Sequence, residues 1–500
     1  MTDTVSVRQG RLRGRADRGV MAFLGVPYAA PPFGADRMRP PRAPQPWEGV
    51  REAGSYGPTC PKGDYPPQYA PLFPEVVIPG TDCLNLNIWT PDPGGSGLPV
   101  LVWLHGGSFM NGSGSVAEYR GTAFARDGVV CVTINYRLGA EGFLHTPDGV
   151  SNVGLLDQLA ALTWVHDNIA AFGGDPSKVT VAGESAGAMS VTTLLSMPDA
   201  AGLFHRAIAQ SGAGHHTMAP AQGAMVARFL ADNLGVEPTR DAVAALPVEQ
   251  VTRAAEALTA EVQTAPDPAK WGELSLSLLP FMPTVDGDVL PAAPLGPIAA
   301  GQGAGVEVLV GYNSEEARLF LAPVGAMDAV DEATALAATA GYGVPPEPTI
   351  RQYRHHRPDA RPSDLMAAVI TDWFWRIPAI RLAEARAAAT AATFIAATFV
   401  YEFTWRSPSF DGELGACHGV ELPFVFDTLD VANTAPRLGA SPPQAVADTA
   451  HAAWVRFITH GDPGWAPYDT ATRTTGLLAE TLRVVDDPAG DERSVWDGHR

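Results

Sequence analysis

The chain has few cysteines and no long apolar run, and both absences narrow its class. Only 4 of its 500 residues are cysteine, too few for a disulfide scaffold. No window approaches the roughly 18 uncharged apolar residues of a membrane-spanning helix. The first eight residues have neither a basic start nor an apolar stretch, so we expect no secretory signal and a cytoplasmic location.

Positive charge is also scarce. Lysine and arginine total 34 against 54 aspartates and glutamates, and lysine occurs only at Lys62, Lys178 and Lys270. A net charge of −20 argues against a nucleic-acid partner, because phosphate binding needs a cationic face. Hydrophobic residues at 46% and charged residues at 18% are typical of a globular protein with a substantial core.

Short apolar runs alternate with helix-length segments through the first three hundred residues. The runs lack polar alternation, which indicates strands buried on both faces of a mostly parallel sheet. They are Val100–Leu104, Val129–Asn135, Val179–Ala182, His205–Gln210 and Glu307–Val310. Residues 154–172 show helical spacing that stops at a Gly-Gly pair. The order predicts a doubly wound α/β fold.

The later part of the chain is less regular. Residues from about 321 to 392 become Ala-rich and predict a helical cap or subdomain packed on the sheet. A further strand is expected at Phe394–Phe403. We therefore expect one large domain over residues 1–500 with a helical insertion.

A candidate nucleophile follows the run that ends at Ala182. Gly183-Glu184-Ser185-Ala186-Gly187 matches Gly-x-Ser-x-Gly, in which a sharp strand-to-helix turn exposes the serine hydroxyl. The flanking glycines are needed because the turn crowds the backbone. The helix that begins at Ala186 places one backbone N–H beside the hydroxyl, where it can bind an oxyanion.

A second set of oxyanion donors is expected from the turn His105-Gly106-Gly107-Ser108-Phe109, directly after an earlier strand. The orienting acid is expected just past the strand that ends near Val310, where Glu315 and Glu316 are both candidates. For the base we favour His418, in a Gly-flanked loop. The other histidines that follow Glu316 occupy polar, turn, terminal or helical positions: His355, His356, His451, His460 and His499.

A set of ordered motifs then gives a specific resemblance. They include Phe23-Leu24-Gly25-Val26-Pro27-Tyr28-Ala29, Asp82-Cys83-Leu84-Asn85-Leu86-Asn87-Ile88-Trp89, His105-Gly106-Gly107, Asn135-Tyr136-Arg137-Leu138-Gly139, Gly183 to Gly187 and Glu421-Leu422-Pro423-Phe424-Val425-Phe426. In these motifs the chain resembles the type B carboxylesterases, the family of p-nitrobenzyl esterase-like enzymes and cholinesterases. The resemblance implies the α/β-hydrolase fold, with a large central sheet and helical cap insertions.

The resemblance also implies roles for individual residues. Ser185 is the nucleophile, His418 the base and Glu316 the orienting acid, which resolves the tie with Glu315. The implied oxyanion donors are the amides of Gly107, Ser108 and Ala186; Glu184 and Ser211 resemble supporting positions behind them. From their positions beside these residues, four more could line an apolar substrate pocket: Phe109, Met110, Met189 and Phe320.

The chain departs from the family pattern at three places. Ser108 stands where many members have a third glycine, and its Cβ narrows the site. Thr81 replaces a usual glutamate, which puts an ion pair with Arg37 in doubt, and Ala317 replaces a glycine after the acid. Cys60 and Cys83 match the family's first disulfide, although a cytosolic location would keep them reduced.

These features predict a serine carboxylesterase that hydrolyses esters of small to medium apolar substrates through an acyl-enzyme. Amide or carbamate hydrolysis is the alternative within the same chemistry. A binding protein without catalysis is the alternative outside it, and the presence of Ser185, Glu316 and His418 argues against that. We expect no metal or organic cofactor, a small-molecule ester as the only partner, and a monomer or homodimer.

Overall fold

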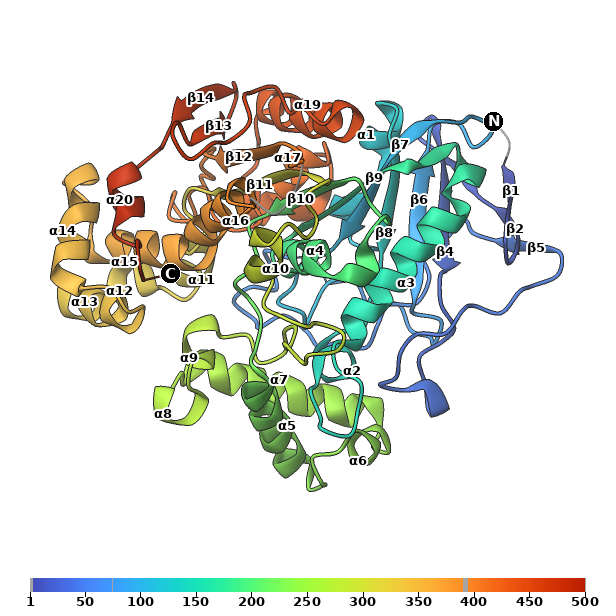
Figure 1. The fold of residues 1–500 in the computed structure, drawn as a ribbon, viewed down its shortest axis with the longest axis horizontal. Helices are drawn as coiled ribbons and strands as arrows, with labels where there is room; N and C mark the ends of the chain where they lie inside the picture. Colours follow the sequence, from blue (N-terminus) through green and yellow to red (C-terminus); the bar gives the residue numbers. More distant parts are fainter. Residues whose placement is uncertain (1–2, 74, 390–393, 500) are drawn as a thin grey trace.

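A mixed sheet organises the molecule. The computed structural model describes residues 3–73, 75–389 and 394–499, and within these residues eleven strands form one sheet (Figure 1). In spatial order the strands are β14 (Arg483–Asp486), β13 (Thr474–Leu478), β12 (Thr398–Phe403), β11 (Glu307–Asn313), β10 (Arg206–Gln210), β9 (Gly174–Glu184), β7 (Leu98–Leu104), β8 (Val130–Ile134), β6 (Asn85–Thr90), β4 (Val20–Pro27) and β3 (Arg15–Asp17). A small separate sheet contains β1 (Thr4–Val7), β2 (Gly10–Arg13) and β5 (Val50–Glu52).

The centre of the large sheet is parallel and its edges are antiparallel. Pairings from β8 through β7, β9, β10, β11 and β12 to β13 are all parallel. The β3–β4, β4–β6, β6–β8 and β13–β14 pairings are antiparallel. Because the carboxyl ends of parallel strands share one edge, the segments that follow β7, β9 and β11 meet there.

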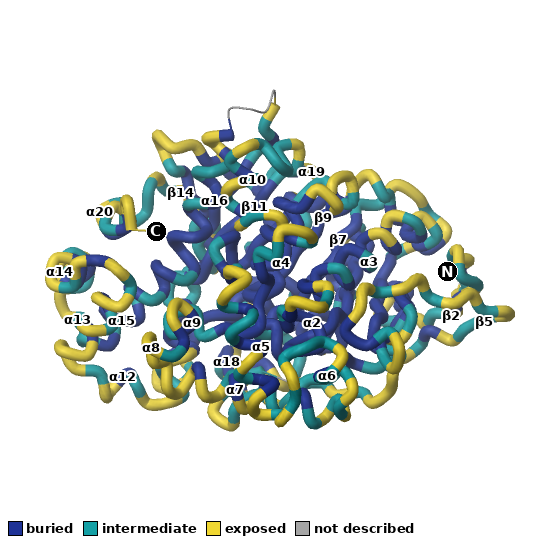
Figure 2. Tube along the Cα trace, turned by 60° about the horizontal axis from the view of Figure 1, so that its bottom comes forward, coloured by how far each residue is buried: buried dark blue, intermediate teal, exposed yellow. Residues whose placement is uncertain are grey.

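Helices cover both faces of this sheet. Alternate residues of β7 point to opposite faces. Val100, Val102 and Leu104 pack in a cluster with residues of α3 (Val153–Asn168), α4 (Ala186–Ser196) and α16 (Ile377–Ala387). Leu101 and Trp103 pack in a second cluster with residues of α1 (Thr122–Arg126) and α19 (Gln444–His460). This alternation is the period of a strand buried on both sides. Figure 2 shows the buried core running through the middle of the molecule.

Helices of the first 300 residues are α1 (Thr122–Arg126), α2 (Gly139–Phe143), α3 (Val153–Asn168), α4 (Ala186–Ser196), α5 (Pro220–Leu234), α6 (Arg240–Ala244), α7 (Val248–Thr264), α8 (Pro268–Trp271), α9 (Leu274–Ser277) and α10 (Leu295–Ala299). Later helices are α11 (Arg318–Leu321), α12 (Ala326–Ala329), α13 (Glu332–Gly341), α14 (Pro346–His356), α15 (Pro362–Thr371), α16 (Ile377–Ala387), α17 (Leu422–Val425), α18 (Ala435–Leu438), α19 (Gln444–His460) and α20 (Gly490–Ser494). Among the described residues, none of these helices combines the length and the apolar character of a membrane-spanning segment.

The five expected apolar strands are confirmed as β7, β8, β9, β10 and β11, and the expected helix is confirmed as α3 followed by a 3-10 turn at Ile169–Phe172. The strand expected from Phe394 begins only at Thr398. Helices α12 to α16 occupy the expected insertion, whose residues 390–392 lie outside the described residues. A second helical group, α5 to α9, was not anticipated (Figure 1). Leu276 of α9 packs against the hydrophobic cluster of α13 to α15.

The structure bears on one departure from the family pattern, at Thr81, and on the cysteine pair that matches it. Position 81, where the family usually has the glutamate partner of Arg37, holds Thr81. Arg37 is nevertheless buried and paired, with its guanidinium 2.6 Å from the carboxylate of Glu141. It also donates to the carbonyls of Ala244 and Leu246, so it joins the core to the connection between α6 and α7. Cys60 and Cys83 are free and buried thiols, with Sγ of Cys60 at 3.7 Å from the carbonyl oxygen of Cys83.

Candidate active site

Ser185 occupies a strained turn between β9 and α4. Its backbone has φ 56° and ψ −124°, a conformation that L-residues rarely adopt. A Cβ added at Gly187 would lie 2.0 Å from the carbonyl oxygen of Leu104, and one at Gly183 would lie 2.5 Å from the backbone of Gly187. The two glycines are therefore required for this turn, as the pentapeptide predicted.

Glu316 and His418 are in direct contact. Glu316 follows β11 and is fully buried, and its Oε2 lies 2.7 Å from Nδ1 of His418. Its other oxygen accepts a hydrogen bond from the backbone N–H of Asn313 at 2.8 Å. Glu315 instead pairs with Arg318 at 2.9 Å and Arg406 at 2.8 Å. Of the two candidate acids, Glu316 is the one that contacts the histidine.

The other imidazole nitrogen of His418 faces Glu184, the residue before Ser185. Nε2 lies 3.1 Å from Oε1 of Glu184. Among the described residues, no hydrogen bond joins Ser185 Oγ to His418. Burial alone would lower the pKa of His418, but the nearby carboxylates, Glu184 first, raise it to about 9. Burial raises the pKa of Glu184 to about 8, against the opposing effect of His418.

Glu421 is a third buried carboxyl group near His418, in addition to Glu184 and Glu316. Glu421 accepts hydrogen bonds from Asn313 Nδ2 at 2.6 Å and from Gln210 Nε2 at 3.1 Å. Burial, together with the charge of Glu316, raises the pKa of Glu421. Ser211, expected at a supporting position, is buried at the end of β10, and its N–H donates to the carbonyl of Gly311. No role for Glu421 was predicted from the sequence, although the residue lies in one of the motifs that carry the family resemblance.

The glycine turn after β7 packs directly on the nucleophile. A Cβ added at Gly106 would lie 2.6 Å from Glu184 Oε2 and 3.1 Å from Ser185 Cβ. Gly107, Ser108 and Phe109 all have positive φ, at 109°, 56° and 59°. In the described part of the chain, the N–H groups of Gly107 and Ser108 donate to no acceptor. The turn therefore presents free donors near Ser185, and Ala186 adds the unpaired N–H of a helix start.

Among the predicted pocket residues, Phe320 lies against the site. Its ring centroid is 5.7 Å from that of His418, and 39% of its surface is exposed. The other three are buried in the main core, and for them the lining of a substrate pocket stays a prediction: Phe109, Met110 and Met189. Trp375 was not predicted from the sequence, and its ring centroid lies 5.2 Å from that of His418. The aromatic run Trp373-Phe374-Trp375 in an Ala-rich segment was the available signal.

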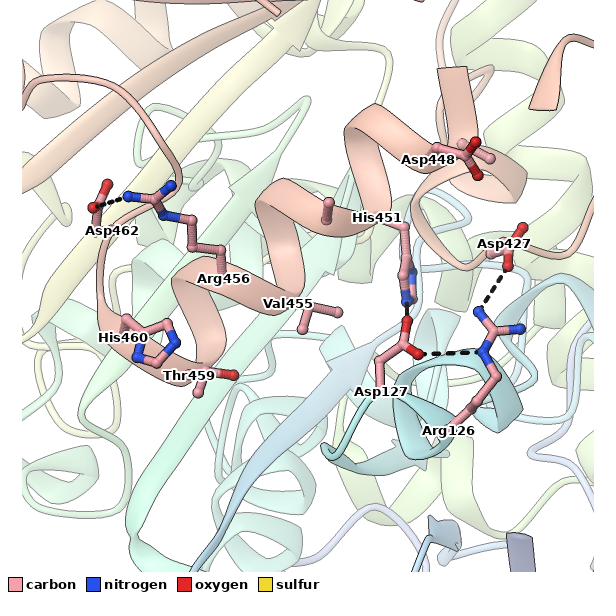
Figure 3. A pocket seen from close by; sticks show the side chains of 12 residues that line it. Arg126, Asp127, Asp427, Asp448, His451, Val455, Arg456, Thr459, His460 and Asp462 are labelled. Atoms are coloured by element: carbon pink, nitrogen blue, oxygen red, sulfur yellow. Dashed lines mark hydrogen bonds and ion pairs between the residues drawn. The ribbon is translucent and has the colours of Figure 1, made fainter. Parts of the chain in front are cut away.

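His451, one of the alternative bases, has a separate environment. It lines a surface cavity of about 710 Å³ between α1 and α19, with none of the predicted site residues (Figure 3). Its Nδ1 lies 2.7 Å from the carbonyl oxygen of Val425 and its Nε2 lies 3.1 Å from Asp127. The hydrogen bond from His451 is the main cause that lowers the pKa of Asp127 to about 2. Both nitrogens of His451 are thus engaged away from Ser185.

Comparison with known proteins identifies the family of the chain. The sequence profile of the carboxylesterase family matches residues 1–476. The chain is 35% identical to the para-nitrobenzyl esterase of Bacillus subtilis (strain 168) over 98% of this chain and 97% of that one. It is 36% identical to the phenmedipham hydrolase of Pseudarthrobacter oxydans over 91% and 89% of the two chains.

Solved structures agree with the fold as well. A carboxylesterase of Geobacillus stearothermophilus superposes with a TM-score of 0.85 at 37% identity, covering 99% of this chain and 100% of that chain. The expected α/β-hydrolase fold is therefore confirmed. The relatives of this chain are esterases and hydrolases, and the activity of the chain is the hydrolysis of carboxylic esters. The chain belongs to the carboxylesterase family.

Proposed function

We propose that this protein hydrolyses esters of small to medium apolar substrates through an acyl-enzyme formed on Ser185. The observation that carries the proposal is the 2.7 Å contact between Glu316 and His418 at the sheet edge that holds the strained Ser185 turn. A nucleophile, a base and an acid that orients the base make up the machinery of serine acyl transfer.

In the first half of the reaction, His418 Nε2 turns from Glu184 to Ser185 and takes the proton of Oγ as Oγ attacks the ester carbonyl. Glu316 keeps Nδ1–H in place and stabilises the imidazolium that forms. The amides of Gly107, Ser108 and Ala186 bind the oxyanion. The C–O bond to the alcohol then breaks as His418 donates this proton to the leaving oxygen, so that the alcohol departs and the acyl group stays on Ser185.

In the second half, water replaces the alcohol. His418 takes a proton from water as the hydroxide oxygen attacks the acyl carbonyl of Ser185. Collapse of the second tetrahedral intermediate breaks the bond to Oγ, which regains its proton from His418, and the acid leaves. Phe320 and Trp375 beside His418 favour an apolar substrate. The similarity to a para-nitrobenzyl esterase, whose name specifies an aromatic benzyl group, supports a substrate that carries an aromatic ring.

An organophosphate tests the activated serine. We expect one equivalent to add to the protein, with the mass shift mapped to the Ser185 peptide, because only an activated hydroxyl attacks phosphorus at a useful rate. A protein that binds ligands without catalysis would take up no label. Turnover of matched ester, amide and carbamate substrates then separates the alternatives within acyl transfer.

The pH profile tests the contact between His418 and Glu184. His418 acts as a base only when it is neutral, and its raised pKa of about 9 means that kcat/KM rises as pH increases from 7 toward 9. Replacing Glu184 with glutamine removes the largest of the charges that raise this pKa. We expect the acidic limb of kcat/KM against pH to move to lower pH in Glu184→Gln. An unmoved limb would show that Glu184 does not act on His418.

Ser108 gives a prediction about substrate size. Glycine accepts the positive φ of this position, so Ser108→Gly is expected to leave the thermal unfolding temperature nearly unchanged. Removing the Cβ widens the oxyanion turn. We therefore expect kcat/KM for tert-butyl or branched alcohol esters to rise relative to ethyl esters of the same acid. Equal changes for both alcohols would mean that Ser108 does not limit alcohol size.

A further inference from the structure

Trp375 has a buried N–H group without an acceptor. The side chain is 4% exposed, and in the described residues its indole Nε1 has no hydrogen-bond partner. Indole nitrogen is a donor only, so it cannot be satisfied in another way. Buried polar groups in proteins nearly always have a partner, and an exception calls for an explanation.

The ring of Trp375 lies at the catalytic histidine. Its centroid is 5.2 Å from that of His418, and Phe320 stacks on it at 5.7 Å with an interplanar angle of 13°. Phe320 in turn lies 5.7 Å from His418 and is 39% exposed. The three rings contact one another, and Phe320, the most exposed of them, joins the protein surface to the pair formed by Trp375 and His418.

The segment that carries Trp375 is fixed from several sides. It is a π-helical turn, Asp372–Arg376, between α15 and α16, and such turns occur frequently at functional sites. Arg376 pairs with Asp372 at 2.9 Å and donates to the carbonyl of Ala489 at 2.9 Å. The hydroxyl oxygen of Thr371 accepts from the N–H of Ala317, next to the catalytic acid, at 3.2 Å. These contacts preset the indole position.

The chemistry of the surroundings narrows the acceptor. Three carboxyl groups adjoin or support His418, namely Glu184, Glu316 and Glu421. A substrate carboxylate would be repelled by them, whereas a neutral oxygen would not. The flat stacked surface of Phe320 and Trp375 suits an aromatic ring.

We propose that Trp375 is a specificity-determining residue whose Nε1–H binds a neutral carbonyl oxygen carried on an aromatic ring of the ester substrate. The substrate class is thereby aryl or benzyl esters with a ring carbonyl in addition to the ester group. This inference rests on the proposed esterase function, because it places the oxygen in a substrate that Ser185 attacks.

Matched substrates test the hydrogen bond separately from ring contacts. We would compare acetyl-substituted benzyl acetates and methyl acetylbenzoates, each in ortho, meta and para forms, with partners in which isopropenyl replaces acetyl. The shape is kept and the acceptor is lost. Wild-type protein is expected to prefer the acetyl member of at least one pair by about tenfold in kcat/KM. No preference in any pair overturns the proposal, whatever the behaviour of variants.

The variant Trp375→Phe keeps an aromatic ring and removes the N–H. We expect it to abolish the preference, so that kcat/KM falls about tenfold more for the acetyl member than for its partner. Trp373→Phe is the matched control, since Trp373 lies in the same turn but its ring contacts Tyr342 and Phe374 instead of His418. If Trp375→Phe lowered kcat/KM by the same factor for both members of every pair, Trp375 would contribute only ring contacts, and the proposed hydrogen bond would be wrong.

A last measurement keeps the two proposals apart. Organophosphate labelling of Ser185 at full stoichiometry in Trp375→Phe shows that the variant is folded and its triad intact. If wild-type protein takes up no label and hydrolyses none of the esters, the esterase mechanism itself fails, and the Trp375 proposal fails with it. Labelling and turnover without acetyl preference overturn the Trp375 proposal only.

Discussion

Replacing Ser185 with alanine is expected to lower kcat for ester hydrolysis by at least about 10⁴-fold. The Ser185 hydroxyl is the group that forms the acyl-enzyme. Without it, the neighbouring residues can accelerate only the direct attack of water on the ester. Loss of the nucleophile in a serine hydrolase leaves only the residual catalysis of the oxyanion donors and substrate binding. Initial rates with p-nitrophenyl acetate and butyrate test this expectation. The enzyme concentration must be high enough to detect weak remaining activity.

A matched control for this variant is Ser190→Ala. Ser190 is also buried, lies in α4 just beyond the nucleophile turn and accepts a hydrogen bond from Gln158 at 3.0 Å. We expect it to lose stability by about 1 kcal/mol and to keep kcat within a few-fold of wild type. If Ser185→Ala hydrolysed these esters at the parent rate, the acyl-enzyme mechanism would be wrong.

Replacing Glu316 with glutamine is expected to lower kcat by about 10³- to 10⁴-fold while the protein stays folded. Oε2 of Glu316 holds Nδ1 of His418 at 2.7 Å. An amide at this position presents an N–H or a neutral oxygen, so it can favour the wrong imidazole tautomer and no longer stabilises the imidazolium. Because the negative charge also helps to raise the pKa of His418, the acidic limb of the pH profile moves to lower pH.

Glu315→Gln controls for the loss of a neighbouring charge. Glu315 accepts from the N–H of Ala416 and pairs with Arg318 and Arg406. Its replacement is expected to destabilise the protein, by weakening these ion pairs, and to change kcat only a few-fold. Thermal unfolding and steady-state rates on both variants separate the two roles. A large loss of kcat in Glu315→Gln with none in Glu316→Gln would reverse the assignment of the acid.

Local rules predicted the parts of the site that are contiguous in the chain. The turn around Ser185 was predictable because its strand, serine and two glycines are adjacent, and no other residue type fits at Gly183 and Gly187. The central strands were predictable because burial on both faces leaves a continuous apolar run. For the same reason the polar or short edge strands, such as β3 and β14, gave no such signal.

Contacts between distant segments were not predictable from the residues alone. Glu315 and Glu316 both follow β11, and only the resemblance to a family distinguished them. Which one reaches His418 depends on how the loop leaves the strand, which neighbouring residues do not determine. Trp375 lies 43 positions before His418 in sequence and meets it through a π-helical turn, a distortion that spacing rules for ordinary helices do not anticipate.

Arg37 shows a similar limit. Its expected partner position holds Thr81, yet the guanidinium is paired, with Glu141 at 2.6 Å. A buried arginine without a carboxylate would be costly, so a partner from another segment satisfies the same charge. The sequence showed that the usual carboxylate partner of Arg37 is absent from position 81. It did not show that Glu141 provides the partner instead.

The central claim is that ester hydrolysis passes through an acyl group on Ser185, and rapid acid quenching tests it most directly. Wild-type protein is mixed with excess p-nitrophenyl acetate, quenched within the first turnovers and digested for peptide mass mapping. We predict acetylation of the peptide that contains Ser185, formed in step with a burst of p-nitrophenol and absent from Ser185→Ala. Full turnover with no acetyl group on Ser185 at any quench time, or with the group on another residue, would contradict the account.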